Sequence, residues 1–449
     1  MTFAARAFVP LLCLTGMLAS PVTLPAQADD ADWSAGFART VITPDNPIFM
    51  SGYGNRDKPA EGKQSDLFAR AAALRDAAGT TCVVVSLDLV GMSPEMGAAI
   101  SQAVEKEHKI PRSQLAFATS HTHCGPALDQ GLTYMLDMKE ADWEKVRAYQ
   151  KVLNQRVIDT VGAALKDMKP ATLAFGHGRC GFAINRRPPI GVGPIDHDVP
   201  VLRISGKDGK VRGVIFGYAC HATVMSFFKW FGDYPGMAAQ YLEDRHPGAV
   251  ALFTAGCGAD QNPLPRRKVE LAEKYGRLLA VAVDEAMEKP MTPVTGSLKA
   301  AYTTTDLAFE RIPPKEEIET WLKSTSRFER ARGEYLLREL KSKNSLAPTY
   351  AYPVQVWKVG NAFTWVTLGG EVVVDYALRL KKELGAETTW VTGYANDVMA
   401  YIPSERVLKE GGYEGASSMI VYQQPSSWKT GLEDQIVKTV HALKNGMAK

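Results

Sequence analysis

Short β-rich runs alternate with amphipathic helical runs along much of this chain, and this alternation limits the folds that it can adopt. The apolar patterns predict strands at 81–90, 115–119, 211–219 and 249–254, and helices at 94–106, 143–166 and 268–288. Alternating strands and helices are typical of α/β proteins. In open α/β sheets the functional residues usually follow the carboxyl ends of strands. We therefore predict an α/β protein whose site is formed by the loops after these strands.

The C-terminal part has a different pattern, in which strand-like runs follow one another. The ranges 292–309 and 350–368 predict strands, 314–341 and 372–384 predict helices, and a last helix is expected around 432–443. No internal repeat, low-complexity tract or clear linker is found. The expected fold is therefore one large domain, residues 29–449, of mixed β-sheets with flanking helices.

The N-terminal segment, residues 1–28, predicts a cleaved signal peptide. It carries one charged side chain, Arg6, then an apolar stretch, and it ends in Ala26-Gln27-Ala28, a small-x-small cleavage pattern. A membrane anchor needs about 20 continuous apolar residues, whereas Pro10 and Gly16 interrupt the apolar stretch of this segment. We expect a secreted or periplasmic protein without an integral membrane segment after cleavage.

Charge and cysteine content limit the partners and the kind of metal site. The net charge is +3, with basic and acidic residues interspersed, so nothing indicates a nucleic-acid partner. No Cys-x-x-Cys is present, which argues against a thiolate zinc finger. Outside the signal segment the cysteines are Cys82, Cys124, Cys180, Cys220 and Cys257. Four of them neighbour the candidate site segments, where a disulfide would brace the site, but the spacing does not fix a pairing.

Two histidines, His121 and His123, directly follow the predicted strand 115–119 and precede a Gly-Pro turn. In an extended segment, side chains at i and i+2 point to the same face, so both rings would meet at the end of the strand. Neutral imidazole is the commonest metal ligand, and it titrates near physiological pH. The pair alone leaves open a metal site, an acid/base site or ordinary buried histidines.

Three further segments stand at similar strand ends. His221 ends the strand 211–219, and Glu371 follows two glycines after the strand 350–368. The loop 256–263 is rich in small residues, which allow backbone N–H groups to approach a substrate. A core histidine, a carboxylate at a helix start and a plain turn are the alternative interpretations of these three segments.

Taken in order, these segments resemble the N-terminal catalytic domain of the neutral/alkaline (non-lysosomal) ceramidases over nearly all of the chain after residue 28. The matching stretches are 35–44, 51–54, 83–88, Ser120-His121-Thr122-His123-Cys124-Gly125-Pro126, Ile184-Asn185-Arg186, Tyr218-Ala219-Cys220-His221, 256–263, Gly370-Glu371, Tyr401 and 413–417. Their order and spacing are specific to this family.

The resemblance implies one Zn²⁺ per chain. The ligands that it implies are His121, His221, Glu371 and Tyr401. It further implies that His123 faces the substrate, and that Arg186 and Tyr413 hold the scissile carbonyl or its oxyanion. Two imidazoles, a carboxylate and a phenol oxygen are acceptable zinc donors that leave a position open for water. A zinc-bound hydroxide would attack the carbonyl, and His123 would protonate the leaving group.

Two departures from the family pattern bear on the substrate. Where the family has Gly-Asp-Val-Ser-Pro, with an essential serine, the aligned stretch 259–263 has Asn262 in the serine's place. Asn262 cannot act as a nucleophile, although its amide can donate a hydrogen bond to an oxyanion. In addition, full ceramidases continue into an immunoglobulin-like C-terminal domain, whereas the last element expected here is the helix 432–443.

The resulting hypothesis is a secreted zinc-dependent amidohydrolase of the ceramidase type. Its substrate is expected to be a small-molecule or lipid-like N-acyl compound. A zinc-dependent carboxylic-ester hydrolase or deacylase, acting on an acylated sugar or another small substrate, is the first alternative. A non-catalytic zinc-containing binding protein is the second, against which His123, Arg186 and Tyr413 argue, because binding alone needs no acid/base beside the metal.

Overall fold

The structure is a computed structural model that describes residues 33–447, together with 1, 2 and 4. Apart from residues 1, 2 and 4, the predicted signal peptide therefore lies outside the described residues. Among the helices that are described, none has the length and apolar character needed to cross a membrane.

The largest element is a nine-stranded mixed sheet with the order β4-β3-β2-β1-β5-β7-β8-β9, in which β11 pairs with β5. The strands are β1 Trp33–Val41, β2 Phe68–Asp76, β3 Thr81–Leu87, β4 Leu115–Thr119, β5 Lys169–Arg179, β7 Asp198–Gly206, β8 Val211–Tyr218, β9 Val250–Ala255 and β11 Thr292–Pro293. The pairs β3/β4 and β8/β9 are parallel, so each pair ends at the same edge. Those ends carry the two candidate histidine segments.

A second sheet has the order β12-β13-β14-β16 and packs against one face of the first. Its strands are β12 Leu298–Ala308, β13 Thr349–Val359, β14 Phe363–Leu368 and β16 Thr389–Thr392. Tryptophans fill the space between the sheets, and Trp365 stacks on Trp390 with ring centroids 4.4 Å apart. Two short pairs complete the strands: β6 Ala183–Asn185 with β10 Gln261–Pro263, and β15 Glu371–Val372 with β17 Tyr401–Ile402.

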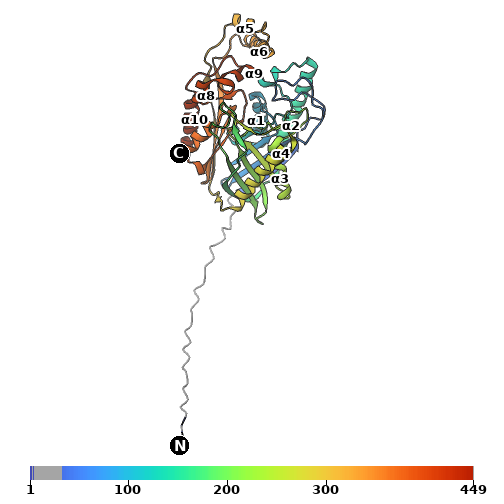
Figure 1. Ribbon diagram of the computed structural model, residues 1–449. Helices are drawn as coiled ribbons and strands as arrows, with labels where there is room; N and C mark the ends of the chain where they lie inside the picture. The colour runs from blue at the N-terminus through green and yellow to red at the C-terminus, as the bar shows by residue number, and fades with distance from the viewer. Residues whose placement is uncertain (3, 5–32, 448–449) are drawn as a thin grey trace.

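Helices cover the outer faces of both sheets (Figure 1). Three pack on the large sheet, α2 Glu140–Lys166, α3 Asp233–Arg245 and α4 Val269–Glu288, and α1 Pro94–His108 packs against α2. The second sheet is covered by α7 Val374–Leu384 and α10 Leu432–Gly446. The remaining helical segments are α5 Lys315–Trp321, α6 Arg327–Lys343, α8 Glu405–Glu410, α9 Ser418–Val421, η1 Arg112–Gln114, η2 Gly131–Met135, η3 Ala386–Thr388 and η4 Tyr413–Ser417. The predicted α/β class with mixed sheets and flanking helices is confirmed.

The segment 393–395 joins the two edges of the large sheet. Gly393 N donates to Ala255 O of β9 at 3.0 Å, and Thr119 N of β4 donates to Tyr394 O at 3.3 Å. This segment directly follows β16 of the second sheet. The carboxyl ends of β4, β8, β9 and β16 are thereby held together by backbone hydrogen bonds.

Several details differ from the sequence predictions. The helix expected at 314–341 is two helices, α5 and α6, because the Ser326 side chain accepts from Glu329 N and so begins a new helix. The strand expected at 292–309 is interrupted between β11 and β12. The helix α3 was not predicted. The possibility of a disulfide that braces the site, which the sequence left open, is not realised among the described residues, because Cys124, Cys180, Cys220 and Cys257, like Cys82, are free and buried.

Candidate metal centre

The candidate ligands lie where separate strands end or begin. His121 comes two residues after β4, and His221 comes three residues after β8. Glu371 and Tyr401 are the first residues of β15 and β17, and the parallel pairing of these strands places them directly side by side. Four segments far apart in the sequence therefore meet at one point.

The two histidines of the His-x-His meet for a reason other than the predicted one. His121 has φ of 57°, in the left-handed region that non-glycine residues rarely adopt, so the segment is a turn and not an extended strand. The turn still brings the rings together: His121 Nε2 and His123 Nε2 are 3.1 Å apart. Left-handed residues at a site indicate strain that the surrounding fold maintains. Tyr394 is a second left-handed residue, with φ of 52°, and its ring centroid lies 4.3 Å from that of His121.

The donor atoms of the four predicted ligands converge. Glu371 Oε2 lies 3.3 Å from His121 Nε2 and 3.0 Å from His221 Nε2. Tyr401 OH lies 3.3 Å from His221 Nε2. The four side chains are almost fully buried, with at most 3 % of their surface exposed. Bulk water therefore does not solvate this cluster.

Hydrogen bonds fix which ring nitrogens carry protons. His121 Nδ1 donates to Val90 O at 2.5 Å, and His221 Nδ1 donates to Gly258 O at 2.8 Å. Gly258 can approach this closely only without a side chain, since a Cβ there would lie 2.5 Å from Cys220 N. With Nδ1 protonated, each Nε2 presents a lone pair to the centre, as metal-bound histidines do.

The electrostatics of Glu371 favour a cation at this point. Burial favours its neutral form, but positive charge placed on His121 and His221 lowers the pKa of Glu371 well below its usual range, so a cation at this point stabilises the carboxylate. Its Oε1 accepts a short hydrogen bond from Tyr422 OH, whereas its Oε2 has no hydrogen-bond partner among the described residues. Burying hydrogen-bond acceptors that face one another with no proton between them costs free energy. A metal ion would relieve that cost, so the residues present fit one.

The position of Tyr422 leads to a testable prediction. Its phenol OH holds Glu371 in place, and losing such a partner typically lowers metal affinity about 10-fold to 100-fold. Tyr422→Phe is expected to weaken zinc binding by this factor in a competition titration against a chelator. Tyr241→Phe on α3 is the matched control and should bind zinc as the unchanged protein does. Unaltered affinity in Tyr422→Phe would contradict the arrangement.

Arg186 lies against the centre and is held by a carboxylate. Its Nε donates to Glu414 Oε1 at 2.8 Å, and its Nη2 donates to Tyr401 OH at 2.9 Å. Burial opposes the charge, but Tyr401 and Glu414 raise the pKa of Arg186 well above its usual range. Glu414 is fixed in turn by Arg187 at 2.7 Å. Arg186 thus presents a permanent positive charge beside the predicted ligands.

Asn262 and Tyr413 occupy different positions at the site. Asn262 lies on β10 with 5 % of its surface exposed, and its Oδ1 accepts long hydrogen bonds from Arg186 Nη1 at 3.5 Å and Thr223 Oγ1 at 3.4 Å. Tyr413 is 45 % exposed and packs its ring against that of Tyr401 at 5.2 Å. Asn262 therefore lies within the site, whereas Tyr413 stands at its solvent side.

His123 is next to the other histidines but is held differently. Its ring packs against that of Tyr53 at 4.7 Å and fits beside Gly52, where a Cβ would lie 2.6 Å from it. Burial, together with His121 and His221, lowers the pKa of His123 well below its usual range. Its Nδ1 has no hydrogen-bond partner among the described residues. His121, His123 and His221 also form a buried group with metal-ligand spacing, which leaves His123 as an alternative ligand by geometry.

Sequence reasoning did not single out Tyr53, Tyr394, Tyr422 and Glu414. Tyr53 and Glu414 lie within stretches that carry the family resemblance, but their contacts with His123 and Arg186 are not visible there. Tyr394 OH lies 3.5 Å from His221 Nδ1. The repeated tyrosines between residues 394 and 422 were the feature of the sequence that could have indicated Tyr394 and Tyr422.

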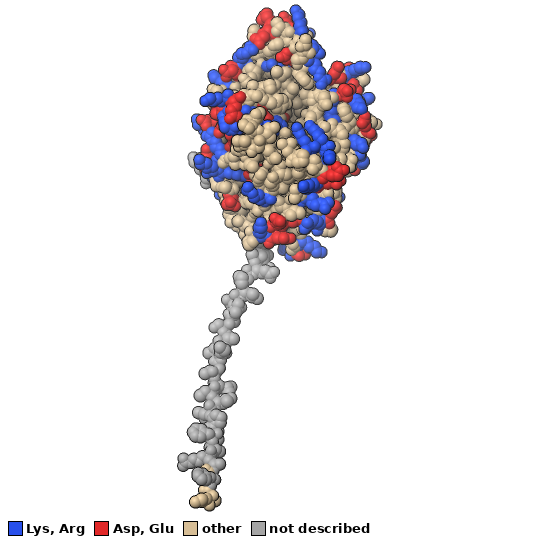
Figure 2. Space-filling view, in the orientation of Figure 1, with Lys and Arg blue, Asp and Glu red and all other residues tan. Residues whose placement is uncertain are grey.

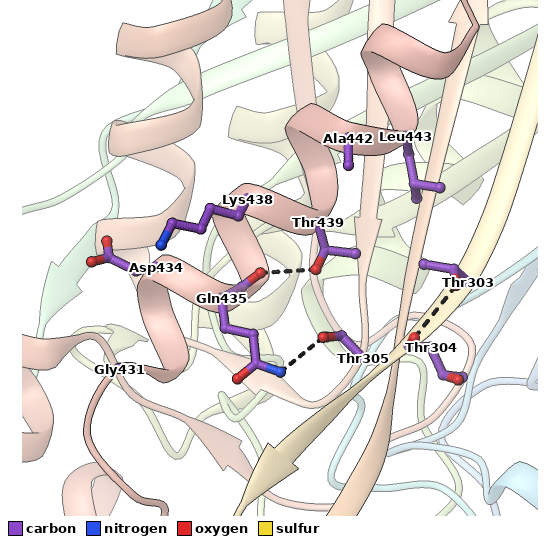
Figure 3. A pocket seen from close by; sticks show the side chains of 10 residues that line it. All are labelled: Thr303, Thr304, Thr305, Gly431, Asp434, Gln435, Lys438, Thr439, Ala442 and Leu443. Carbon is purple, nitrogen blue, oxygen red and sulfur yellow. Dashed lines mark hydrogen bonds between the residues drawn. The ribbon is translucent and has the colours of Figure 1, made fainter.

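Two grooves of the structure are not lined by the histidines. A groove of about 770 Å³ lies between β12 and α10, where Gln435 donates to Thr305 at 2.9 Å (Figure 3). A second cavity of about 500 Å³ has Tyr422, whose OH donates to Glu371, among its lining residues, whereas Glu371 itself does not line it. The centre itself is enclosed by side chains from its own loops.

A family model described as neutral/alkaline non-lysosomal ceramidase, N-terminal, matches residues 34–257. The chain belongs to this ceramidase family. The matched range contains His121, His123, Arg186 and His221, whereas Glu371 lies beyond it. The resemblance recognised in the sequence is confirmed, and membership supports a hydrolase that acts on ceramide-like amide bonds. The buried three-histidine group agrees with a metal-dependent family.

Solved ceramidase structures have the same fold as this ceramidase-family chain. One, described as a ceramidase complexed with C2, is 17% identical, has a TM-score of 0.68, and is matched over 92% of this chain and 76% of its own. The neutral ceramidase from Pseudomonas aeruginosa is 20% identical, also with a TM-score of 0.68, over 92% of this chain and 75% of its own. No curated protein matches the chain.

Proposed function

We propose that this ceramidase-family protein is an exported, zinc-dependent amidohydrolase of N-acyl compounds. The observation that carries the proposal is the convergence of unprotonated His121 Nε2 and His221 Nε2 on the unpartnered Glu371 Oε2, beside a permanent positive charge. The family and this geometry both favour hydrolysis of an amide. A binding protein without turnover would need neither His123 nor Arg186 at this position.

The zinc ligands in this proposal are His121, His221, Glu371 and Tyr401. The set of nitrogen and oxygen donors suits zinc, and it leaves room for a further ligand. When bound, zinc would lower the pKa of a coordinated water toward about 7 and polarise the acyl carbonyl. Burial raises the pKa of the Tyr401 phenol well above its usual range, and the hydrogen bond from Arg186 acts in the opposite direction by favouring the phenolate form.

We assign His123 to proton transfer and not to metal binding. Ligating histidines almost always donate their second ring N–H to a fixed acceptor, as His121 and His221 do, whereas His123 Nδ1 has no such acceptor among the described residues. A neutral imidazole with a free nitrogen can take up a proton and deliver it to the departing amine. Amide cleavage requires this delivery because an unprotonated amine anion is a poor leaving group.

Arg186 is assigned to the carbonyl oxygen of the substrate. Glu414 and Tyr401 fix its guanidinium in place, and its Nη1 points between Asn262 and His221. A preorganised donor of this kind stabilises negative charge on oxygen in a water-excluded site. Asn262 completes the polar wall, and its Nδ2 makes no hydrogen bond with a described residue, so it can donate to the same oxygen.

Asn262 provides a direct test of its assigned role. If its amide donates to the developing oxyanion, Asn262→Ala should lower kcat about 10²-fold with zinc content unchanged. Steady-state kinetics with metal analysis measure both quantities. Asn445→Ala, an exposed position at the end of α10, is the control. An unchanged kcat in Asn262→Ala would remove this residue from the mechanism.

The proposed activity is tested on matched substrates with the purified protein. The panel contains fluorescent N-acylsphingosine, short N-acyl amines and simple acyl esters, and zinc content is determined in parallel. Amide turnover that requires zinc supports the proposal. Turnover of esters alone would favour the ester-hydrolase alternative, and bound zinc without turnover would favour a binding protein.

Export is proposed from the sequence of residues 1–28. It requires that the mature protein begin near Asp29 in the secreted or periplasmic fraction. N-terminal sequencing of protein recovered from that fraction tests this, and an uncleaved start at Met1 would contradict it.

A further inference from the structure

One side of the candidate site is rich in arginines that have no carboxylate within ion-pair distance, although the buried Asp233 acts on Arg266 and Arg267 from farther away. On the face shown in Figure 2, basic and acidic side chains are interspersed. Beside the centre, by contrast, Arg56, Arg266 and Arg267 form no ion pair with any described residue. Arg186 and Arg187, in contrast, both pair with Glu414. This local excess of positive charge is not required for holding a zinc ion.

Arg266 and Arg267 follow β10 in the loop that leads from Asn262 to α4. Arg266 Nη1 donates to Thr223 Oγ1 at 3.4 Å, and that hydroxyl in turn donates to Asn262 Oδ1 at 3.4 Å. Burial, then Arg267, and also Arg186 lower the pKa of Arg266, as expected for cations that crowd one another. Arg266 is therefore connected to the wall of the site through a single side chain.

Arg267 is placed on the side of the proton-transfer histidine. Its Nη1 donates to Tyr53 OH at 2.8 Å and to Thr223 O at 3.4 Å, and Tyr53 packs directly on His123. Its backbone has φ of 84° and is held by a hydrogen bond to Val224 O at 2.7 Å. A non-glycine residue kept in this conformation indicates that its position is maintained by the surrounding fold. The side chain is nevertheless exposed to solvent.

We propose that Arg266 and Arg267 bind an anionic group carried by the amine portion of the substrate. In the proposed reaction the departing nitrogen lies next to His123. Arg267 contacts the hydroxyl of Tyr53, whose ring packs on His123, so the width of that ring separates Arg267 from His123. A carboxylate or phosphate attached a few bonds from the amide nitrogen would meet both guanidinium groups, which match planar and tetrahedral oxyanions. Ceramide carries no such charge. The inference rests on the proposed amide hydrolysis and narrows its substrates to anionic N-acyl compounds.

Matched substrate pairs test the inference and separate the two kinds of anion. N-dodecanoylglycine is compared with its neutral N-methylamide, and N-dodecanoylphosphoethanolamine with N-dodecanoylethanolamine. At least one anionic member should have a kcat/KM about 10-fold or more above that of its neutral partner, and this preference should weaken as salt is added. Equal or better turnover of both neutral members would overturn the proposal.

Substitutions locate the preference. Arg267→Gln, and the double substitution with Arg266→Gln, should reduce the anionic-to-neutral ratio of kcat/KM about 10-fold to 100-fold. Lys268→Gln removes an equally exposed cation one residue further on and should leave the ratio unchanged. A similar loss of the ratio in Lys268→Gln would show a general charge effect and contradict a specific subsite.

A binding measurement keeps this inference separate from the proposed function. N-(dodecylsulfonyl)glycine is a sulfonamide that is not a substrate for amide hydrolysis, and its N-methylamide lacks the charge. Calorimetry should give tighter binding of the anionic compound, with the difference lost in Arg267→Gln. Equal binding of the two compounds overturns the subsite even if amides are hydrolysed. If the anionic compound binds more tightly but amides are not hydrolysed, only the proposed activity is contradicted.

Discussion

His221→Gln is expected to lose both the zinc and the activity. His221 Nε2 lies 3.0 Å from Glu371 Oε2 and 3.3 Å from Tyr401 OH, so it is next to two of the other proposed ligand atoms. Without the ion no nucleophile is available near neutral pH, because unbound water has a pKa of about 16. Zinc content should fall well below one per chain, and kcat/KM for the preferred amide by at least about 10³-fold.

The control for this prediction is another histidine with a carboxylate neighbour. His441 on α10 contacts Glu383 at 2.7 Å on the surface, and His441→Gln should keep full zinc and activity. Because His221 also donates to Gly258 O, the fold of His221→Gln is checked by circular dichroism and thermal unfolding. A folded His221→Gln that retains one zinc per chain would refute the ligand set.

His123→Gln is expected to separate metal binding from turnover. Removing a general acid typically costs about 10²-fold to 10⁴-fold in rate, and we expect a loss of that size in kcat for amides. Zinc content should stay at that of the unchanged protein, because the ligands His121, His221, Glu371 and Tyr401 are intact. Metal analysis and steady-state kinetics on the same preparation measure both.

Two other outcomes of His123→Gln carry meaning. Loss of zinc would show that His123 belongs to the coordination sphere, as the spacing of the three buried histidines also permits. A much smaller loss with esters than with amides would be consistent with protonation of the leaving nitrogen, since an alkoxide departs more easily than an amine anion. His197→Gln is a suitable control, because His197 is not part of the three-histidine group and contacts Ala183 O at 2.8 Å.

Local patterns in the sequence predicted the elements that present the ligands. The strand expected at 115–119 has those bounds in the structure, and β8 and β9 differ from their predictions by one residue at most. Alternation of apolar side chains and the helical period depend on neighbours in the chain, so they can be recognised without knowledge of the fold. The positions of His121 and His221 at strand ends followed from the same patterns.

Other parts of the site depend on contacts between distant residues. The bond between Tyr422 and Glu371 and the pairing of Glu371 with Tyr401 require sheets and turns that no local pattern specifies. The left-handed turn at His121 was missed because non-glycine residues as a class rarely adopt that conformation. The assumption of an extended segment correctly predicted that the two rings meet, but its backbone geometry was wrong. The break between α5 and α6 could have been predicted from the sequence, since Ser326 and Glu329 have the spacing of a capping box.

Zinc titration of the metal-free protein tests the central claim most directly. The protein is stripped with a chelator, zinc is added back in steps, and hydrolysis of the preferred N-acyl amide is followed together with the amount of bound metal. The proposed centre predicts no turnover without zinc, a rise in proportion to bound zinc, and a plateau at one zinc per chain. Full activity of the stripped protein, or a plateau that does not depend on bound zinc, would contradict it.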